Sequence, residues 1–169
     1  REWFARCLTA VEDIPTEAML AGIDWRWETF PEYLANVERL PNTAHDAEAI
    51  AEALEALRFT VFKGIDLTGN QFESLVEEFE AASAEADTVV FYYAGHGFQL
   101  DGLNHLAPVD AVLRDRERIN SETFVLNDVI ARIHRRQRQT IVFLDACRNN
   151  PLPLSARDGM GTGLAQVVA

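Results

Sequence analysis

The chain has 169 residues, of which 48% are hydrophobic, and a formal net charge of −12. This is the composition of an ordinary globular protein, and it excludes a disordered chain. Such a negative charge repels phosphate backbones and anionic lipids, so we expect neither a nucleic acid nor a membrane as partner. No apolar run approaches the roughly 18 residues that would span a bilayer.

Residues 1–38 form a leader segment that contains all three Trp residues of the chain. Two stretches of it, residues 7–15 and 22–34, resemble an internal segment of the N-acyl-D-amino-acid deacylases, which are metal-dependent amidohydrolases on a barrel. None of that family's metal-binding motifs is present, and a barrel cannot close from one segment. The resemblance implies a chimeric chain. We expect the leader not to be an independent domain and to cover a sheet edge or a helix face.

Residues 39–169 are predicted to form an α/β domain. Apolar residues at helical spacing predict helices over about 43–57, 72–82 and 126–133, and apolar runs predict strands over 58–62, 88–93 and 140–144. A turn is expected at Gly69-Asn70, ahead of the second helix. This alternation implies right-handed crossovers and a mostly parallel sheet between helical layers. In such sheets the ligand site lies beyond the carboxyl ends of the strands.

Two reactive side chains follow the predicted strands at 88–93 and 140–144. His96 stands between two glycines after the first, and Cys147 follows the second. Each motif alone is more often a turn or buried packing. If these strands are adjacent, about 4.8 Å apart, the imidazole can activate the thiolate nucleophile and later protonate a leaving amine. The glycines would let a substrate backbone approach, and the N–H groups of Gly97 and Cys147 would face an oxyanion.

The segments around these residues resemble the caspase and metacaspase-like cysteine peptidases, over about residues 40–169. His96 and Cys147 are about 50 residues apart, as the corresponding pair is in caspases. The resemblance implies a caspase-type sheet and a thiol endopeptidase that hydrolyses polypeptides, with His96 as general base and acid and Cys147 as nucleophile. The matching segments are residues 40–42, 46–47, 90–97, 108–111 and 142–148.

Two acidic residues predict the substrate specificity. Asp145 stands where animal caspases have Gln, and in metacaspase-like proteins this position resembles an acidic wall of the pocket for a basic residue; Asp46 matches a second wall. An Arg or Lys side chain would relieve the repulsion between two desolvated carboxylates. We therefore predict cleavage after Arg or Lys. The alternative for Asp46 is an exposed acid at a helix start. Ala94 and Thr43 replace residues common in metacaspases, Ser and Cys, which leaves pocket detail open.

The caspase-like part is expected to be truncated at both ends. No apolar run ahead of Leu40 supplies the first strand of the family, and the chain stops at Ala169, before the last strands. The alternative function is therefore a catalytically inactive caspase-like interaction module or fragment, because a misplacement of ~1 Å costs about 100-fold in rate. Candidate self-cleavage points follow the third helix, at Arg135, Arg136 and Arg138.

We expect no metal or other cofactor, because the four His and two Cys show no metal-ligand spacing. Calcium activation stays open, and the acids Asp110, Asp115 and Glu117 are expected to form a solvated loop. His105, where relatives commonly have Tyr, is expected to be structural. Two widely separated Cys favour a cytoplasmic location. The sequence does not determine the oligomeric state.

Overall fold

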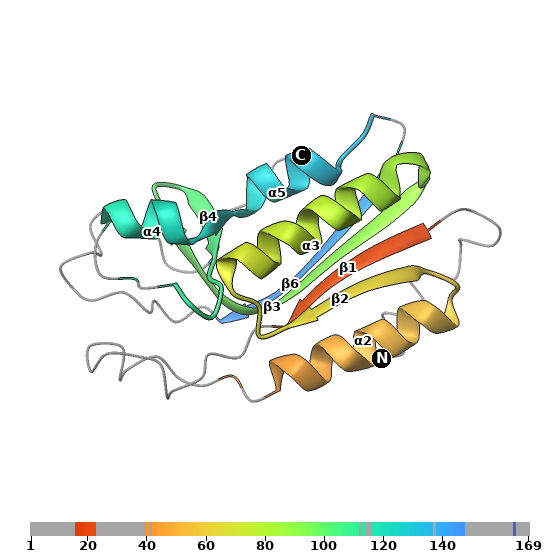
Figure 1. Ribbon diagram of the computed structural model, residues 1–169, viewed down its shortest axis with the longest axis horizontal. Helices are drawn as coiled ribbons and strands as arrows, with labels where there is room; N and C mark the ends of the chain where they lie inside the picture. Colours follow the sequence, from red (N-terminus) through yellow and green to blue (C-terminus); the bar gives the residue numbers. More distant parts are fainter. Residues whose placement is uncertain are drawn as a thin grey trace.

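The computed structural model describes residues 16–22, 40, 42–111, 113, 116–136, 138–147 and 164. They form a sheet with helices on both faces, which confirms the predicted α/β class (Figure 1). Four strands are parallel and adjacent in the order β2 (Thr60–Ile65), β1 (Thr16–Gly22), β3 (Thr88–Leu100) and β6 (Gln139–Cys147). Beyond them, β3 pairs antiparallel with β4 (Leu103–Leu106), which pairs with β5 (Phe124–Val125).

The helices are divided between the two faces of the sheet (Figure 1). α2 (Thr43–Ala56) packs against one face, and α3 (Gly69–Ala82) and α5 (Leu126–Ile133) pack against the other. Two short helices, η3 (Ser83–Glu85) and α4 (Arg116–Glu122), lie in the connections. No helix in the part of the chain that the structure describes is long and apolar enough to cross a membrane.

β3 is buried on both faces, which explains its continuous apolar sequence. Alternate side chains belong to two separate core clusters. Val90, Tyr92 and Ala94 pack with the α2 cluster, whereas Phe91 and Tyr93 pack with the α3 and α5 cluster. The two clusters fix which face each later residue of β3 occupies, because side chains alternate along a strand.

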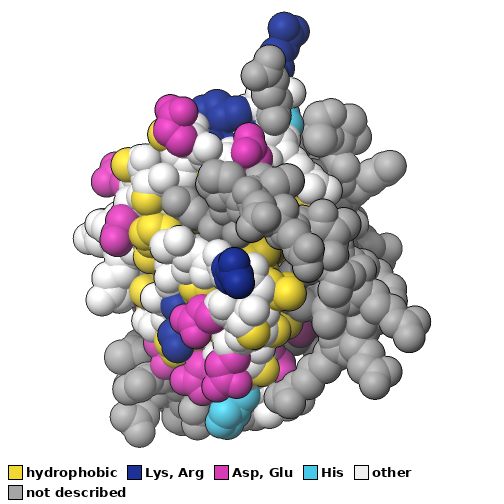
Figure 2. All heavy atoms as spheres, turned by 90° about the vertical axis from the view of Figure 1, so that its right-hand side faces the viewer, with side chains coloured by type: hydrophobic (Ala, Val, Ile, Leu, Met, Phe, Trp, Pro, Cys, Tyr) yellow, Lys and Arg dark blue, Asp and Glu magenta, His cyan; other side chains and the backbone are white. Residues whose placement is uncertain are grey.

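The outer face of α2 is acidic. Glu48, Glu52 and Glu55 are exposed on this helix. The lower part of the face in Figure 2, where α2 lies in Figure 1, shows acidic side chains gathered together. Part of the excess negative charge therefore lies on the layer that covers the Tyr92 side of the sheet.

Two predicted element boundaries are wrong. Gly69 and Asn70 are the first residues of α3 rather than a turn, because Thr68 caps the helix: its hydroxyl accepts from the Gln71 N–H, and the Gln71 side chain accepts from the Thr68 N–H. β2 begins at Thr60, two residues later than predicted. Arg58 has a φ of 66°, a left-handed conformation that a strand cannot contain.

The expectation that the first strand is missing is also wrong. β1 lies within the predicted leader and is inserted between β2 and β3, with seven register pairs to β3 from Thr16↔Thr88 to Gly22↔Ala94. Its sequence is Thr-Glu-Ala-Met-Leu-Ala-Gly, which has few of the β-branched and aromatic residues typical of strands. The pairing to both neighbours, rather than local preference, makes it a strand. The leader thus contributes to the sheet instead of only covering it.

Arg138 is a buried cation that joins three parts of the fold. It is 8% exposed. Its guanidinium donates to the carbonyls of Ala86 at 3.0 Å, Ile133 at 2.8 Å and Ala84 at 3.1 Å, and also to the Ser83 carbonyl. These bonds provide hydrogen-bond donors to main-chain carbonyls at the end of α5 and at the η3 turn. Arg138 is therefore not a surface cleavage point, which corrects the sequence-based expectation; Arg135 and Arg136 are exposed.

We predict that Arg138→Met lowers the free energy of unfolding by about 3 kcal/mol or more, because several buried carbonyls lose a charged donor. Urea unfolding followed by circular dichroism measures the change. The matched control is Arg136→Met, an exposed position, where we expect a change within about 0.5 kcal/mol. Equal effects of the two substitutions would contradict the assigned role of Arg138.

Candidate active site

The predicted nucleophile and base occupy paired positions on neighbouring strands. β3 and β6 are parallel over nine register pairs, from Thr88↔Gln139 to His96↔Cys147. The sequence predicts that both residues follow their strands, but β3 continues through His96 to Leu100 and β6 ends at Cys147 itself. Paired positions of a parallel ladder lie about 4.8 Å apart and on one face of the sheet. β3 and β6 are therefore neighbours in the sheet, which the sequence alone could not establish.

Position 96 lies on the face of the sheet that α2 covers. Tyr92 and Ala94 belong to the α2 cluster, and position 96 follows in the same alternation. On β6, Ile141 and Phe143 belong to that cluster too. His96 is buried, with 3% of its surface exposed.

The main chain of His96 is held by two donors. Its carbonyl accepts from the Ala107 N–H at 3.1 Å and from the Tyr93 hydroxyl at 2.8 Å. Tyr93 itself is fully buried. The sequence analysis counted Tyr93 only as strand packing. The signal that it missed is general: a buried tyrosine usually directs its hydroxyl to a partner.

The two glycines around His96 are required by contacts inside the protein. A Cβ on Gly95 would lie 2.7 Å from the Tyr93 hydroxyl oxygen, and one on Gly97 would lie 3.0 Å from the Ala146 Cβ. The sequence analysis ascribed both glycines to the approach of a substrate backbone. The described contacts give each glycine a reason that needs no substrate.

The N–H of Gly97 points away from β4. Gly97 pairs with Leu106, and the Ala107 N–H donates to the carbonyl of His96, one residue before. This pattern identifies Gly97↔Leu106 as a pair without mutual hydrogen bonds, in which both N–H groups point away from the partner strand. The N–H of Gly97, which was predicted to face an oxyanion, therefore points toward the edge of β3 that pairs with β6.

The two acids predicted to bind the substrate, Asp46 and Asp145, both raise the pKa of Tyr92. Asp46 lies in the first turn of α2, and Asp145 is the register partner of Ala94; both are exposed. Burial, together with the carboxylates of Asp145 and Asp46, raises the pKa of Tyr92 to about 12. Two acids about 100 residues apart in sequence thus approach the same side chain on the α2 face.

A comparison of the chain with models of protein families identifies its family. The model of the caspase domain matches residues 28–166. The chain belongs to the caspase domain family. A search of curated proteins found no match. The family match begins within the predicted leader, and the likeness of that leader to deacylases gains no support from the comparisons.

The caspase family membership supports a cysteine peptidase acting on polypeptides in general terms. No group of three or more metal-ligating side chains occurs within the described ranges. Asp110 is exposed and its carboxylate accepts from the Gly69 N–H at 2.8 Å, so it ties its loop to the start of α3. Glu117 is exposed on α4, and Asp115 lies outside the described residues.

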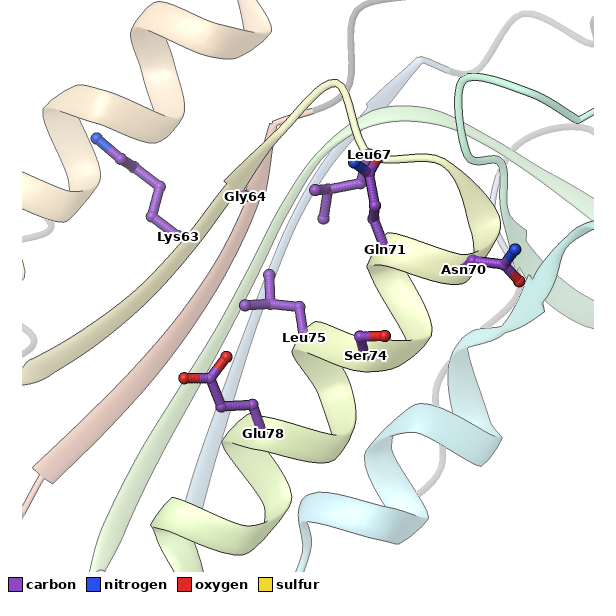
Figure 3. Close-up of a pocket in the computed structure, with 8 residues that line it drawn as sticks. All are labelled: Lys63, Gly64, Leu67, Asn70, Gln71, Ser74, Leu75 and Glu78. Carbon is purple, nitrogen blue, oxygen red and sulfur yellow. The ribbon is translucent and has the colours of Figure 1, made fainter.

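Two hollows in the described part of the caspase domain lie away from the predicted site residues His96, Asp46 and Asp145. One of ≈ 310 Å³ lies between β2 and α3, where Figure 3 shows Leu75 directed from α3 toward the sheet. The other, of ≈ 430 Å³, is lined by the start of α3 and by Asp110. Neither is lined by His96, Asp46 or Asp145. We therefore assign the candidate site to the α2 face and not to these hollows.

His105 has a structural environment. It is buried, stacks on Phe98 with ring centroids 5.4 Å apart, and its Nδ1 lies 2.8 Å from the Thr123 hydroxyl. That hydroxyl donates to the Ile119 carbonyl at 2.6 Å, so it accepts the Nδ1 proton of a neutral ring. Burial lowers the pKa of His105, against a partial opposing effect of Asp101 and Asp128.

We predict that Asp145→Asn lowers the pKa of Tyr92 from about 12 toward its ordinary value of 10.0, and that Asp46→Asn does so to a smaller extent. Ring ¹³C chemical shifts of the tyrosines, titrated from about pH 8 to pH 12, measure this. Tyr92→Phe assigns the signal. Glu52→Gln, at an exposed position of α2, is the control and should leave the pKa unchanged. A Tyr92 signal indifferent to both Asp substitutions would show that the carboxylates do not approach it.

We also predict that His105 contributes to acid sensitivity. Between its lowered pKa and 6.5, the unfolded chain binds a proton at His105 that the folded protein does not, so the free energy of unfolding decreases as the pH falls below about 6.5. His105→Gln should therefore lose less stability between about pH 7 and pH 5, measured by urea unfolding at each pH. His134→Gln, an exposed position, serves as control. The prediction fails if the two variants lose the same amount.

Proposed function

We propose that this caspase-domain protein is a cysteine endopeptidase that cleaves polypeptides after Arg or Lys, with Cys147 as nucleophile and His96 as general base and acid. The observation that carries the proposal is the register pair His96↔Cys147, the last pair of the parallel β3–β6 ladder. An imidazole beside a thiol stabilises the thiolate, which is the reactive form of cysteine. The strand ends are also where ligands bind in sheets of this kind.

In the proposed reaction His96 accepts the thiol proton of Cys147, and the sulfur attacks the carbonyl carbon of the scissile peptide bond. The N–H groups of Gly97 and Cys147 would stabilise the oxyanion that forms. The C–N bond then breaks while His96 gives a proton to the leaving amine, which leaves a thioester on Cys147. His96 next accepts a proton from water, which attacks the thioester carbonyl. The C–S bond then breaks, the acid product leaves, and His96 returns the proton to the sulfur of Cys147.

The two carboxylates around Tyr92 support the preference for a basic residue. Asp46 and Asp145 come from different elements, and both act on the Tyr92 hydroxyl. A guanidinium offers five N–H donors in a fixed planar arrangement, which allows it to bind two carboxylates at once. An Asp side chain before the scissile bond would be repelled by the same pair.

The proposal predicts hydrolysis of a fluorogenic peptide with Arg before the scissile bond and not of the same peptide with Asp there. Cys147→Ala and His96→Ala should each abolish hydrolysis. Asp145→Asn should lower kcat/KM for the Arg peptide by roughly 10- to 100-fold, the effect of losing one charged hydrogen bond of about 1.5–3 kcal/mol. Glu52→Gln, a charge change on the exposed face of α2, should leave kcat/KM within about twofold.

The outcomes separate this function from the inactive alternative. Hydrolysis of both the Arg and the Asp peptide would agree with the dyad and contradict the acidic pocket. Hydrolysis that survives Cys147→Ala would reject the dyad. Silence on Arg, Lys and Asp peptides, with and without calcium and with a folded circular-dichroism spectrum, would favour a catalytically inactive caspase-like module.

A further inference from the structure

The Tyr93 ring packs on the face of β3 opposite α2, but its hydroxyl bonds to the main chain of His96, the proposed base. The Tyr93 ring belongs to the α3 and α5 core cluster and is fully buried. Its hydroxyl donates to the carbonyl of His96, 2.8 Å away, and lies 3.3 Å from the carbonyl of Ala107. A tyrosine has one proton to donate, and the shorter distance identifies His96 as the main acceptor.

This hydrogen bond lies where β3 changes neighbours. The last partner of β3 in β1 is Ala94, and the first in β4 is Gly97. On this edge of β3, Gly95 and His96 therefore lie between two ladders, whereas on the other edge they pair with Ala146 and Cys147 of β6. On the edge between the ladders, the His96 carbonyl accepts from the Ala107 N–H, and the Tyr93 hydroxyl is a second donor to it.

Gly95 provides the space through which the hydroxyl reaches His96. A Cβ there would lie 2.7 Å from the hydroxyl oxygen and 2.9 Å from Cζ of the same ring. Both distances are shorter than a van der Waals contact allows. A side chain at position 95 and the Tyr93 hydroxyl at its observed place thus exclude each other, so the two residues form a matched pair.

We propose that Tyr93 is a positioning residue that holds the main chain of His96 so that the imidazole is set against Cys147. The inference rests on the proposed dyad, since it gives Tyr93 a role only through His96. Misplacing a catalytic group by ~1 Å costs about 100-fold in rate, so loss of this bond should affect the chemical step more than substrate binding.

The test compares two variants that each lose one buried hydroxyl. Tyr93→Phe removes the bond to His96 and keeps the ring. Ser83→Ala removes a buried hydroxyl of η3, which precedes the amino end of β3; this hydroxyl donates to the Glu80 carbonyl of α3 and accepts from Arg138. We expect Tyr93→Phe to lower kcat about 10-fold or more with KM within about twofold, and Ser83→Ala to change neither, at similar thermal stability. Equal kcat in the two variants would overturn the inference.

A second readout does not require hydrolysis. The rate at which iodoacetamide alkylates Cys147, followed by mass spectrometry against pH, reports how well His96 stabilises the thiolate. Tyr93→Phe should shift this profile from that of the wild type toward that of His96→Ala. If His96→Ala leaves the profile unchanged, the dyad and the inference both fail. If His96→Ala changes the profile and Tyr93→Phe does not, the inference alone fails.

Gly95→Ala provides an independent variant, because the added Cβ displaces the hydroxyl without removing it. We expect a lower alkylation rate near neutral pH. Adding Tyr93→Phe to this variant should then lower the alkylation rate by a smaller factor than it does in the wild type, since the hydrogen bond is already lost. If the effects of the two substitutions on the alkylation rate are simply additive, the proposed coupling between Gly95 and Tyr93 is contradicted.

Discussion

The register between β3 and β6 is the constraint on which the candidate site depends. Nine consecutive pairs lock the two strands together and end on His96↔Cys147. A slip of one residue would move each side chain of one strand to the opposite face, and would place the proposed nucleophile and base on different sides of the sheet. The buried clusters on both faces oppose such a slip, because it would exchange the side chains of β3 that pack in the two clusters.

The two faces of β3 serve different parts of the proposed chemistry. The α2 face carries Tyr92 and His96, with Asp46 reaching it from the start of α2. The opposite face carries the Tyr93 ring, whose hydroxyl returns to the main chain at His96. Consecutive tyrosines in one strand thus have opposite surroundings, since strand geometry sends neighbouring side chains to opposite faces.

Several features of this caspase domain could be read from local sequence. The run Thr88–Tyr93 has a length and composition that only a strand buried on both faces explains, and Phe72, Val76 and Phe79 repeat at the spacing of one helix face. β1 could not be found in this way, because its residues have little strand preference and its conformation comes from pairing with β2 and β3. The continuation of β3 through Gly95 was missed for a related reason: a glycine between apolar and polar residues indicates a turn unless a neighbouring side chain requires the space.

The sequence by itself determined the family likeness, the alternation of helices and strands, and the choice of His96 and Cys147 as the proposed reactive residues, because each of these depends on residue type and spacing along the chain. The tertiary structure decided that β3 and β6 are neighbours, that Asp46 and Asp145 approach one tyrosine, and that Tyr93 and Gly95 fit together around the His96 carbonyl. These relations join residues on different strands and helices, or depend on where one hydroxyl lies in a packed core. Only the folded arrangement fixes such distances.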